Sequence, residues 1–277
     1  MDAPVNKLRP VLKQRLLTTL VLVPPVVAGV LWLPHPMFSL FFAVPVLAAA
    51  WEWAALCGLN RPMQRFFVSA GLAGLLWLLY FPLSHGATIH SVLVTVLGVW
   101  IGVLIWLANP GYVGHPSLKI LLGFIILGCA WGSVIWLHAM GERGPLWVLY
   151  LLVLVWVADS GAYFAGRRFG KHRLAPRISP GKTREGAYGA LVLAFLYSLC
   201  IGIFMQVSSL ASFIVLSLAV VSLSMAGDLF ESLLKRQAGF KDSGNLFPGH
   251  GGVLDRIDGL LAAVPVFLAG ILMWPVL

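Results

Sequence analysis

Residues Ser232 to Asp258 read SLLKRQAGFKDSGNLFPGHGGVLDRID and lie between two long apolar runs. Seven of these residues are charged, namely Lys235, Arg236, Lys241, Asp242, Asp255, Arg256 and Asp258. Each charge costs roughly 3 kcal/mol at the centre of a bilayer, so burying all seven there would cost about 20 kcal/mol. The stretch therefore belongs in water or in a polar cavity. Its acids, bases and glycines, gathered within an otherwise apolar chain, are typical of a functional site.

The composition around this stretch is that of a protein that crosses a membrane many times. Hydrophobic residues make up 60% of the 277 positions and charged residues 10%, and the mean hydropathy is +0.92. These values exclude a soluble domain of ordinary make-up. The three cysteines, Cys57, Cys129 and Cys200, are far apart and form no C-x-x-C pair, so we interpret them as packing residues.

Nine apolar runs have about the length, roughly 20 residues, that a helix needs to span a bilayer. We therefore predict an all-α polytopic membrane protein in which residues 1–277 form a single integral membrane domain. Proline residues inside three of the runs, Pro24 and Pro25, Pro45, and Pro265, predict kinks or local breaks. The runs are Leu16 to Leu33, Phe38 to Leu56, Phe66 to Pro82, Ser91 to Ala108, Leu118 to His138, Leu146 to Ala165, Tyr188 to Met205, Phe213 to Phe230 and Gly259 to Leu277.

Charge distribution predicts the orientation of these spans. With the N-terminus in the cytoplasm and nine crossings, only Arg143 of the 19 lysine and arginine residues falls outside. Such a bias is what the positive-inside rule requires, and dropping one crossing would invert every later loop. The net charge of +9 is thus explained by topology, and a nucleic-acid partner is unnecessary. Glu142 is the only carboxylate in an outer loop, so we expect any chemistry on the cytoplasmic side.

The region 228–258 has the residues of a metal and phosphate site. Asp255 and Asp258 offer the hard oxygen ligands that Mg²⁺ accepts when it also holds substrate phosphates. Lys235, Arg236, Lys241 and Arg256 supply positive charge for phosphate oxygens. Gly249, Gly251 and Gly252 let a ligand approach the backbone N–H groups, and the helix that starts near Val253 is expected to direct its N-terminus at the same place.

The eighth run carries a polar stripe close to this region. Ser224, Asp228, Glu231 and Lys235 recur at four, three and four residues and so share one face of a helix. We expect this face to border a watery cavity in which Asp228 and Asp255 flank one metal ion; structural pairing of the acids with Lys235 or Arg236 is the alternative.

Two further polar residues are open to more than one interpretation. Glu52, near the end of the second run, could be paired with an arginine or belong to the site. His250 could be a general base, a metal ligand or a hydrogen-bond donor to a substrate phosphate.

A second polar stretch runs from Ala158 to Gly186 and includes a basic cytoplasmic loop over residues 166–187. Asp159 lies in the last turns of an apolar run, where a carboxylate is costly unless it has a function or a partner. Ser179 to Thr183 (SPGKT) ends like a phosphate-binding P-loop, but the glycine that the motif requires earlier is Pro176, and no strand is expected before it. Although the segment is not a P-loop, we expect Lys182 and Arg184 to bind phosphate through their positive charge.

These motifs resemble those of the phosphatidate cytidylyltransferase family, also called CDP-diglyceride synthases, in its compact bacterial form. The resemblance rests on S-x-L-K-R, K-D-x-G and P-x-H-G-G-x-x-D-R-x-D in the first stretch and on A-D-S-G-A-Y, F-G-K and S-P-G-K-T-R-E-G in the second. It implies condensation of CTP with phosphatidic acid to give CDP-diacylglycerol and pyrophosphate. It further implies Mg²⁺ and a monovalent cation such as K⁺, a homodimer, and a bacterial inner membrane with the active site on the cytoplasmic face.

Residue chemistry and resemblance together assign three sets of site residues. The expected catalytic residues are Asp228, Asp255, Lys241 and Arg256. The expected substrate-binding residues are Lys182, Arg184, Ser232, Lys235, Arg236, His250, Gly251 and Gly252. The expected metal ligands are Asp228 and Asp255, with Glu231, Asp258 and Asp159 as further candidates.

Charge suggests how such a site would work, and two other functions compete with it. A phosphatidate oxygen must attack the α-phosphorus of CTP although both molecules are anionic, so metal and cationic side chains are needed more than a strong base. A CTP-dependent lipid kinase of the polyprenol type would instead transfer the γ-phosphate. A lipid transporter would place its charges near the bilayer midplane in interrupted helices.

Overall fold

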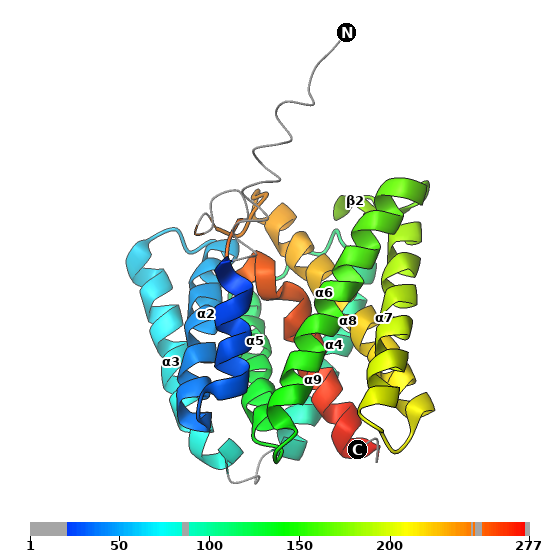
Figure 1. The fold of residues 1–277 in the computed structure, drawn as a ribbon. Helices are drawn as coiled ribbons and strands as arrows, with labels where there is room; N and C mark the ends of the chain where they lie inside the picture. The colour runs from blue at the N-terminus through cyan, green and yellow to red at the C-terminus, as the bar shows by residue number, and fades with distance from the viewer. Residues whose placement is uncertain (1–20, 85–88, 245, 247–250, 275–277) are drawn as a thin grey trace.

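A computed structural model of the chain describes residues 21–84, 89–244, 246 and 251–274, and these residues form a bundle of helices with one small hairpin (Figure 1). Residues 21–32 are helical. The elements that follow are α2 (His35–Leu56), α3 (Pro62–Ser84), α4 (Ile89–Ala108), α5 (Pro116–His138), α6 (Gly144–Phe169), β1 (Arg173–Ala175), β2 (Ser179–Thr183), α7 (Arg184–Phe204), α8 (Leu210–Gln237) and α9 (Leu254–Met273).

Each of the nine predicted spans overlaps a helix of the described residues, which confirms the all-α membrane architecture, while residues 16–20 of the first span and 275–277 of the last lie outside the described residues. Seven described helices are long and apolar enough to cross a membrane, and the shorter apolar helices Val21–Trp32 and Val94–Ala108 occupy the first and fourth predicted spans. Helix α2 continues through Pro45, α9 through Pro265 and the helix of residues 21–32 through Pro24 and Pro25, so none of these prolines breaks its helix. The protein is therefore a multi-pass membrane protein.

Hydrogen bonds between helix ends and connecting segments show which of them lie at the same end of the bundle. At one end, Trp53 donates a hydrogen bond to the carbonyl of Lys119 (2.8 Å), and Gln237 donates one to the carbonyl of Tyr112 (2.9 Å). At the other end, the Arg143 guanidinium donates to the carbonyl of Met205 (3.4 Å). In Figure 1 the hairpin and the start of α9 both lie in the upper half of the bundle, and α9 ends at the lower end.

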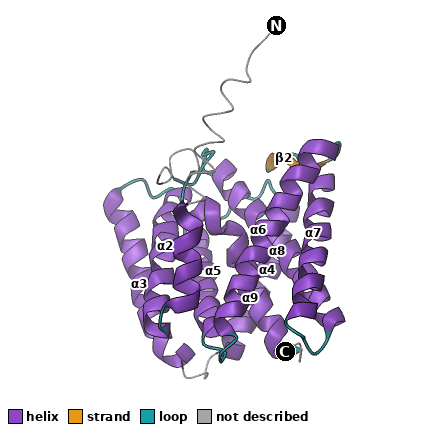
Figure 2. Ribbon diagram, in the orientation of Figure 1, coloured by secondary structure: helices purple, strands orange, loops and turns teal. Residues whose placement is uncertain are grey.

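The basic segment between α6 and α7 is an ordered antiparallel hairpin, which the sequence analysis did not predict (Figure 2). Arg173 pairs with Thr183, and Ala175 pairs with Ser179. Glu185, at the start of α7, closes the hairpin because it accepts hydrogen bonds from the backbone N–H groups of Lys171 and His172 and from His172 Nδ1 (2.7 Å). The hairpin thus holds Lys182 against the bundle instead of leaving it on a loose loop.

Helix α9 is the centre of the bundle and packs against α2, α4, α5, α6 and α8. An aromatic cluster beside it, Trp147, Tyr150, Phe213 and Phe267, is buried, and the Tyr150 hydroxyl lies 2.7 Å from Ser217 Oγ. Lipid tails are as apolar as the side chains, so close van der Waals packing, not removal of surface from water, holds such helices together.

Two glycines allow α8 and α9 to pack most closely where they carry acids. A Cβ atom at Gly227 of α8 would lie 2.7 Å from the carbonyl oxygen of Asp258, and one at Gly259 of α9 would lie 2.5 Å from Ser224 Oγ. A side chain at Gly227 would push the helices apart because it meets backbone, whereas one at Gly259 would first displace the Ser224 hydroxyl. The small residues next to Asp228 and Asp258 therefore set the distance between the two carboxylates.

Replacing Gly227 with valine should force α8 away from α9 and lower the thermal unfolding midpoint of the purified protein, since overpacking costs roughly 1–3 kcal/mol. Gly74→Val is the matched control, because a Cβ at Gly74 meets no atom within 4 Å. Equal unfolding midpoints for the two variants would show that close packing at Gly227 does not hold the helices together.

Candidate active site

A cavity of about 380 Å³ opens between α6, the β hairpin, α7, α8 and α9. This volume lies within the range of pockets that bind small molecules. Its apolar wall includes Val155, Trp156, Met225 and Leu260. Its charged lining combines acids and bases from four elements, namely Asp159, Arg167, Lys182, Asp228, Arg256 and Asp258. Five of these six residues, all but Arg167, belong to the predicted site, although they come from distant parts of the sequence.

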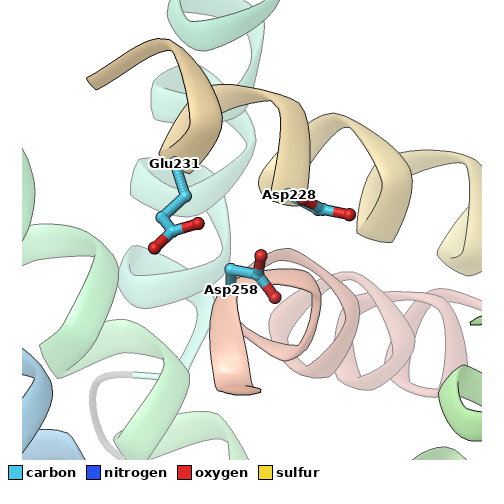
Figure 3. Close-up of side chains that lie close together, drawn as sticks. All are labelled: Asp228, Glu231 and Asp258. Carbon is cyan, nitrogen blue, oxygen red and sulfur yellow. The ribbon is translucent and has the colours of Figure 1, made fainter. Parts of the chain in front are cut away.

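Three carboxylates meet at the boundary between α8 and α9. One oxygen from each of Asp228, Glu231 and Asp258 can be chosen so that all lie within 4.8 Å of one another. Figure 3 shows Glu231 and Asp228 on α8 and Asp258 on the neighbouring helix α9, with the three side chains near the boundary between the helices. Asp228 and Glu231 share a face of α8 because they are three residues apart. The sequence pattern therefore identified all three acids, and helix packing brings the third to the other two.

The three-carboxylate group fits a divalent cation. Carboxylates this close repel one another unless positive charge lies near them. The Lys182 ammonium pairs with Asp228, and the Lys235 ammonium lies 2.5 Å from Glu231 Oε2. Glu231 Oε2 is therefore paired with Lys235, whereas Oε1 of this buried side chain accepts no hydrogen bond from any described residue. Buried oxygens with unused lone pairs are ligands that Mg²⁺ can take.

Asp255 lies in a neighbouring network of hydrogen bonds. Its Oδ1 is 2.6 Å from the Lys235 ammonium, and its Oδ2 accepts from the backbone and hydroxyl of Ser243 (2.9 Å each) and from the Gly252 N–H (2.8 Å). Among the described residues, Asp255 is not part of the three-carboxylate group. Its role as a metal ligand stays a prediction, and the geometry instead joins it to Glu231 through Lys235.

The N-terminus of α9 does not offer its first N–H groups to a phosphate, contrary to our expectation from the sequence. The N–H groups of Val253 and Leu254 donate to Glu52 (2.9 and 2.8 Å), and that of Gly252 donates to Asp255. Protein carboxylates therefore satisfy the positive end of the helix dipole. Contacts of Gly251 and Gly252 with substrate stay a prediction. In the structure, Gly251 has φ of 79°, which favours glycine, and a Cβ atom at this position would collide with Asp255 Oδ2.

Several residues predicted to be catalytic or to bind substrate lie outside the described lining of the cavity. Arg236 donates to the carbonyl of Ile178 (3.4 Å), Arg184 is exposed at the start of α7, and Lys241 is exposed after α8. Ser232 is half-buried on α8. Their substrate contacts stay predictions, and His250 lies outside the described residues.

The sequence analysis gave no site role to Arg167 or its neighbour Tyr163, both of which line the cavity. The Arg167 guanidinium donates to the Tyr163 hydroxyl (2.9 Å). A signal for them existed, because Asp159, Tyr163 and Arg167 are four residues apart and therefore lie on one face of α6.

Replacing Lys235 with methionine should lower the stability of the folded protein strongly. The Lys235 side chain is 12% exposed and lies between the side chains of Glu231 and Asp255, which are 2% and 8% exposed. Removing the cation from a buried ion pair typically costs roughly 3–5 kcal/mol. Thermal unfolding in detergent measures the effect, with the exposed Lys241→Met as control. A variant that unfolds like the control but loses turnover would instead support the sequence-based role of Lys235 in substrate binding.

Comparison with known proteins shows the family to which the chain belongs. The model of the cytidylyltransferase family matches residues 13–274. A phosphatidate cytidylyltransferase of Pseudomonas aeruginosa is 43% identical over 266 residues, which cover 95% of this chain and 97% of that protein. Phosphatidate cytidylyltransferases of Haemophilus influenzae and Brucella suis are 39% and 34% identical and cover 92% and 91% of this chain, and 97% and 90% of their own lengths. The chain belongs to the cytidylyltransferase family.

Proposed function

We propose that this protein transfers the cytidylyl group of CTP to phosphatidic acid and releases CDP-diacylglycerol and pyrophosphate. The observation that carries the proposal is one cavity in a membrane-spanning bundle, in which Asp228 and Asp258 of the three-carboxylate group lie with lysine and arginine side chains. Relatives that match nearly the whole chain are named for this reaction.

The two kinds of cavity wall suit the two substrates. Lys182, Arg167 and Arg256 line one part of the cavity and can bind the phosphates of CTP and of the lipid. Trp156 and Leu260 line the apolar part, and the surrounding bilayer supplies the lipid laterally. A cavity at the boundary between lipid and water can therefore receive one substrate from each side.

The proposed metal ion is Mg²⁺, and Asp228, Glu231 and Asp258 would hold it. When bound, it supplies positive charge that neutralises the CTP phosphates and the departing pyrophosphate. Asp159 lines the same cavity and stays a further candidate ligand. The monovalent cation and the homodimer implied by the family resemblance remain part of the proposal.

The proposed reaction forms one P–O bond and breaks another. A phosphate oxygen of phosphatidic acid attacks the α-phosphorus of CTP, and the bond between that phosphorus and the bridging oxygen to the β-phosphate breaks. The attacking phosphate is already largely ionised near neutral pH, so no side chain has to remove a proton from it. Lys182 and Arg256 would orient the phosphates and stabilise the charge that moves onto pyrophosphate.

We also propose that the protein resides in a bacterial inner membrane with its site facing the cytoplasm. All lysine and arginine residues except Arg143 belong to the predicted cytoplasmic side, which supports this orientation. CTP is a nucleoside triphosphate of the cytoplasm, and the cavity lies at the end of the bundle that carries the basic hairpin.

Two other functions make different predictions for the same cavity. A CTP-dependent lipid kinase would release CDP, whereas cytidylyl transfer releases pyrophosphate. A transporter would need charged groups near the middle of interrupted helices. The acids here lie near the ends of α8 and α9, both of which are continuous, and this placement favours an enzyme.

Replacing Asp258 with asparagine should reduce kcat about 100-fold or more, because the loss of one preorganised charged group raises the barrier by roughly 3 kcal/mol. The assay uses labelled CTP, phosphatidic acid and Mg²⁺ and identifies both products. Asp242→Asn, at an exposed position after α8, is the control. Synthesis at the wild-type rate by Asp258→Asn at saturating Mg²⁺ would contradict the assignment, and CDP as product would indicate a kinase.

A further inference from the structure

Glu52 is a buried carboxylate of α2 that the proposed reaction does not use. Its side chain is 6% exposed, and it is not among the described residues that line the cavity. Burying a carboxylate is costly unless hydrogen bonds or cations compensate it. Its contacts therefore indicate what this charge does.

The Glu52 carboxylate joins α2 to the beginning of α9. Oε1 accepts from the Val253 N–H (2.9 Å), and Oε2 accepts from the Leu254 N–H (2.8 Å). These N–H groups belong to the first turn of the helix, where no carbonyl of the same helix can reach them. A negative charge at this position also interacts favourably with the helix dipole. Glu52 thus caps α9 from another helix about 200 residues earlier in the chain.

A second set of contacts links Glu52 to the three-carboxylate group. Ser243 Oγ lies 2.9 Å from both Glu52 Oε2 and Asp255 Oδ2, so its single hydrogen is shared between the two carboxylates. Asp255 contacts the Lys235 ammonium (2.6 Å), which in turn contacts Glu231 (2.5 Å). A continuous series of polar contacts therefore runs from Glu52 of α2 to Glu231 of α8.

Two glycines fit closely around Glu52. A Cβ atom at Gly244 would collide with Oε1, and one at Gly252 would collide with Oε2. The backbone at Gly244 and at Gly252 therefore approaches the carboxylate closely. Such an enclosure holds the side chain in one position.

The geometry points to Glu52 as a positioning residue that fixes the first turn of α9 and, through it, the place of Asp258 opposite the acids of α8. Asp258 follows Leu254 by one helical turn, about 6 Å along the axis. The inference rests on the proposed reaction, because it gives Asp258 a role in holding the divalent cation. Displacing a ligand by about 1 Å can cost two orders of magnitude in rate.

The test compares Glu52→Gln with the matched control Ser39→Ala. Glutamine keeps the size of the side chain but replaces one acceptor oxygen with an NH₂ group that cannot accept from a backbone N–H. Ser39 is buried on the same helix, and its hydroxyl donates to the carbonyl of His35 (2.8 Å), away from the site. Mn²⁺ binding to the purified protein without substrates is measured by EPR, and turnover is measured against Mg²⁺ concentration.

We expect Glu52→Gln to weaken Mn²⁺ binding about tenfold and to raise the half-saturating Mg²⁺ concentration similarly, since misplaced ligands bind a metal less well. The control should bind Mn²⁺ like the wild type. A smaller folded fraction would lower the maximal rate but would leave both metal constants unchanged. Mn²⁺ affinity of Glu52→Gln within twofold of the wild type would overturn the inference.

Ser243→Ala decides the question if Glu52→Gln does not fold. This variant removes only the hydroxyl shared by Glu52 and Asp255, so it should also weaken Mn²⁺ binding. Unchanged Mn²⁺ affinity of Ser243→Ala would then overturn the inference. Absence of CDP-diacylglycerol with the wild-type protein would contradict the proposed function instead, and the metal-binding comparison would still decide the role of Glu52.

Discussion

The close approach of α8 and α9 is the constraint on which the rest of the site depends. Glycines beside Asp228 and Asp258 let the two helices pack closely. As a result, Asp228 and Glu231 of α8 lie close to Asp258 of α9. Within a membrane bundle, acids at this separation require positive charge nearby. The protein places two lysines there, Lys182 from the β hairpin and Lys235 from α8, and the same requirement makes the group suitable for a divalent cation.

The elements around this pair of helices hold the charges in place. The hairpin is closed by Glu185 and His172, which keeps Lys182 beside Asp228. The first turn of α9 is held by Glu52 and Asp255, so a helix end that could have bound an anion is occupied by the protein's own carboxylates. In the proposed reaction the side chains that line the cavity would bind the substrate phosphates, and position and charge would matter more than proton transfer.

Hydrophobicity and charge in the sequence were sufficient to predict the fold. The nine apolar runs correspond to helices because a backbone in lipid must satisfy its own hydrogen bonds. The helical spacing of Asp228 and Glu231 likewise predicted a polar face, and the charges near Asp258 predicted a site. The β hairpin was missed because its pairing depends on contacts with α7. The sequence analysis preferred Asp255 over Asp258 as a metal ligand. Choosing between them requires knowing how α8 and α9 pack. The role of Glu52 was equally hidden, since its partners follow it by about 200 residues.

The central claim is that Asp228, Glu231 and Asp258 hold one divalent cation between α8 and α9. The most direct measurement is an experimental structure of the protein with Mn²⁺ and a CTP analogue, in which anomalous scattering locates the ion. The account predicts an anomalous peak bounded by oxygens of these three residues. A peak coordinated by Asp255 without Asp258, or a peak away from α8, would contradict it.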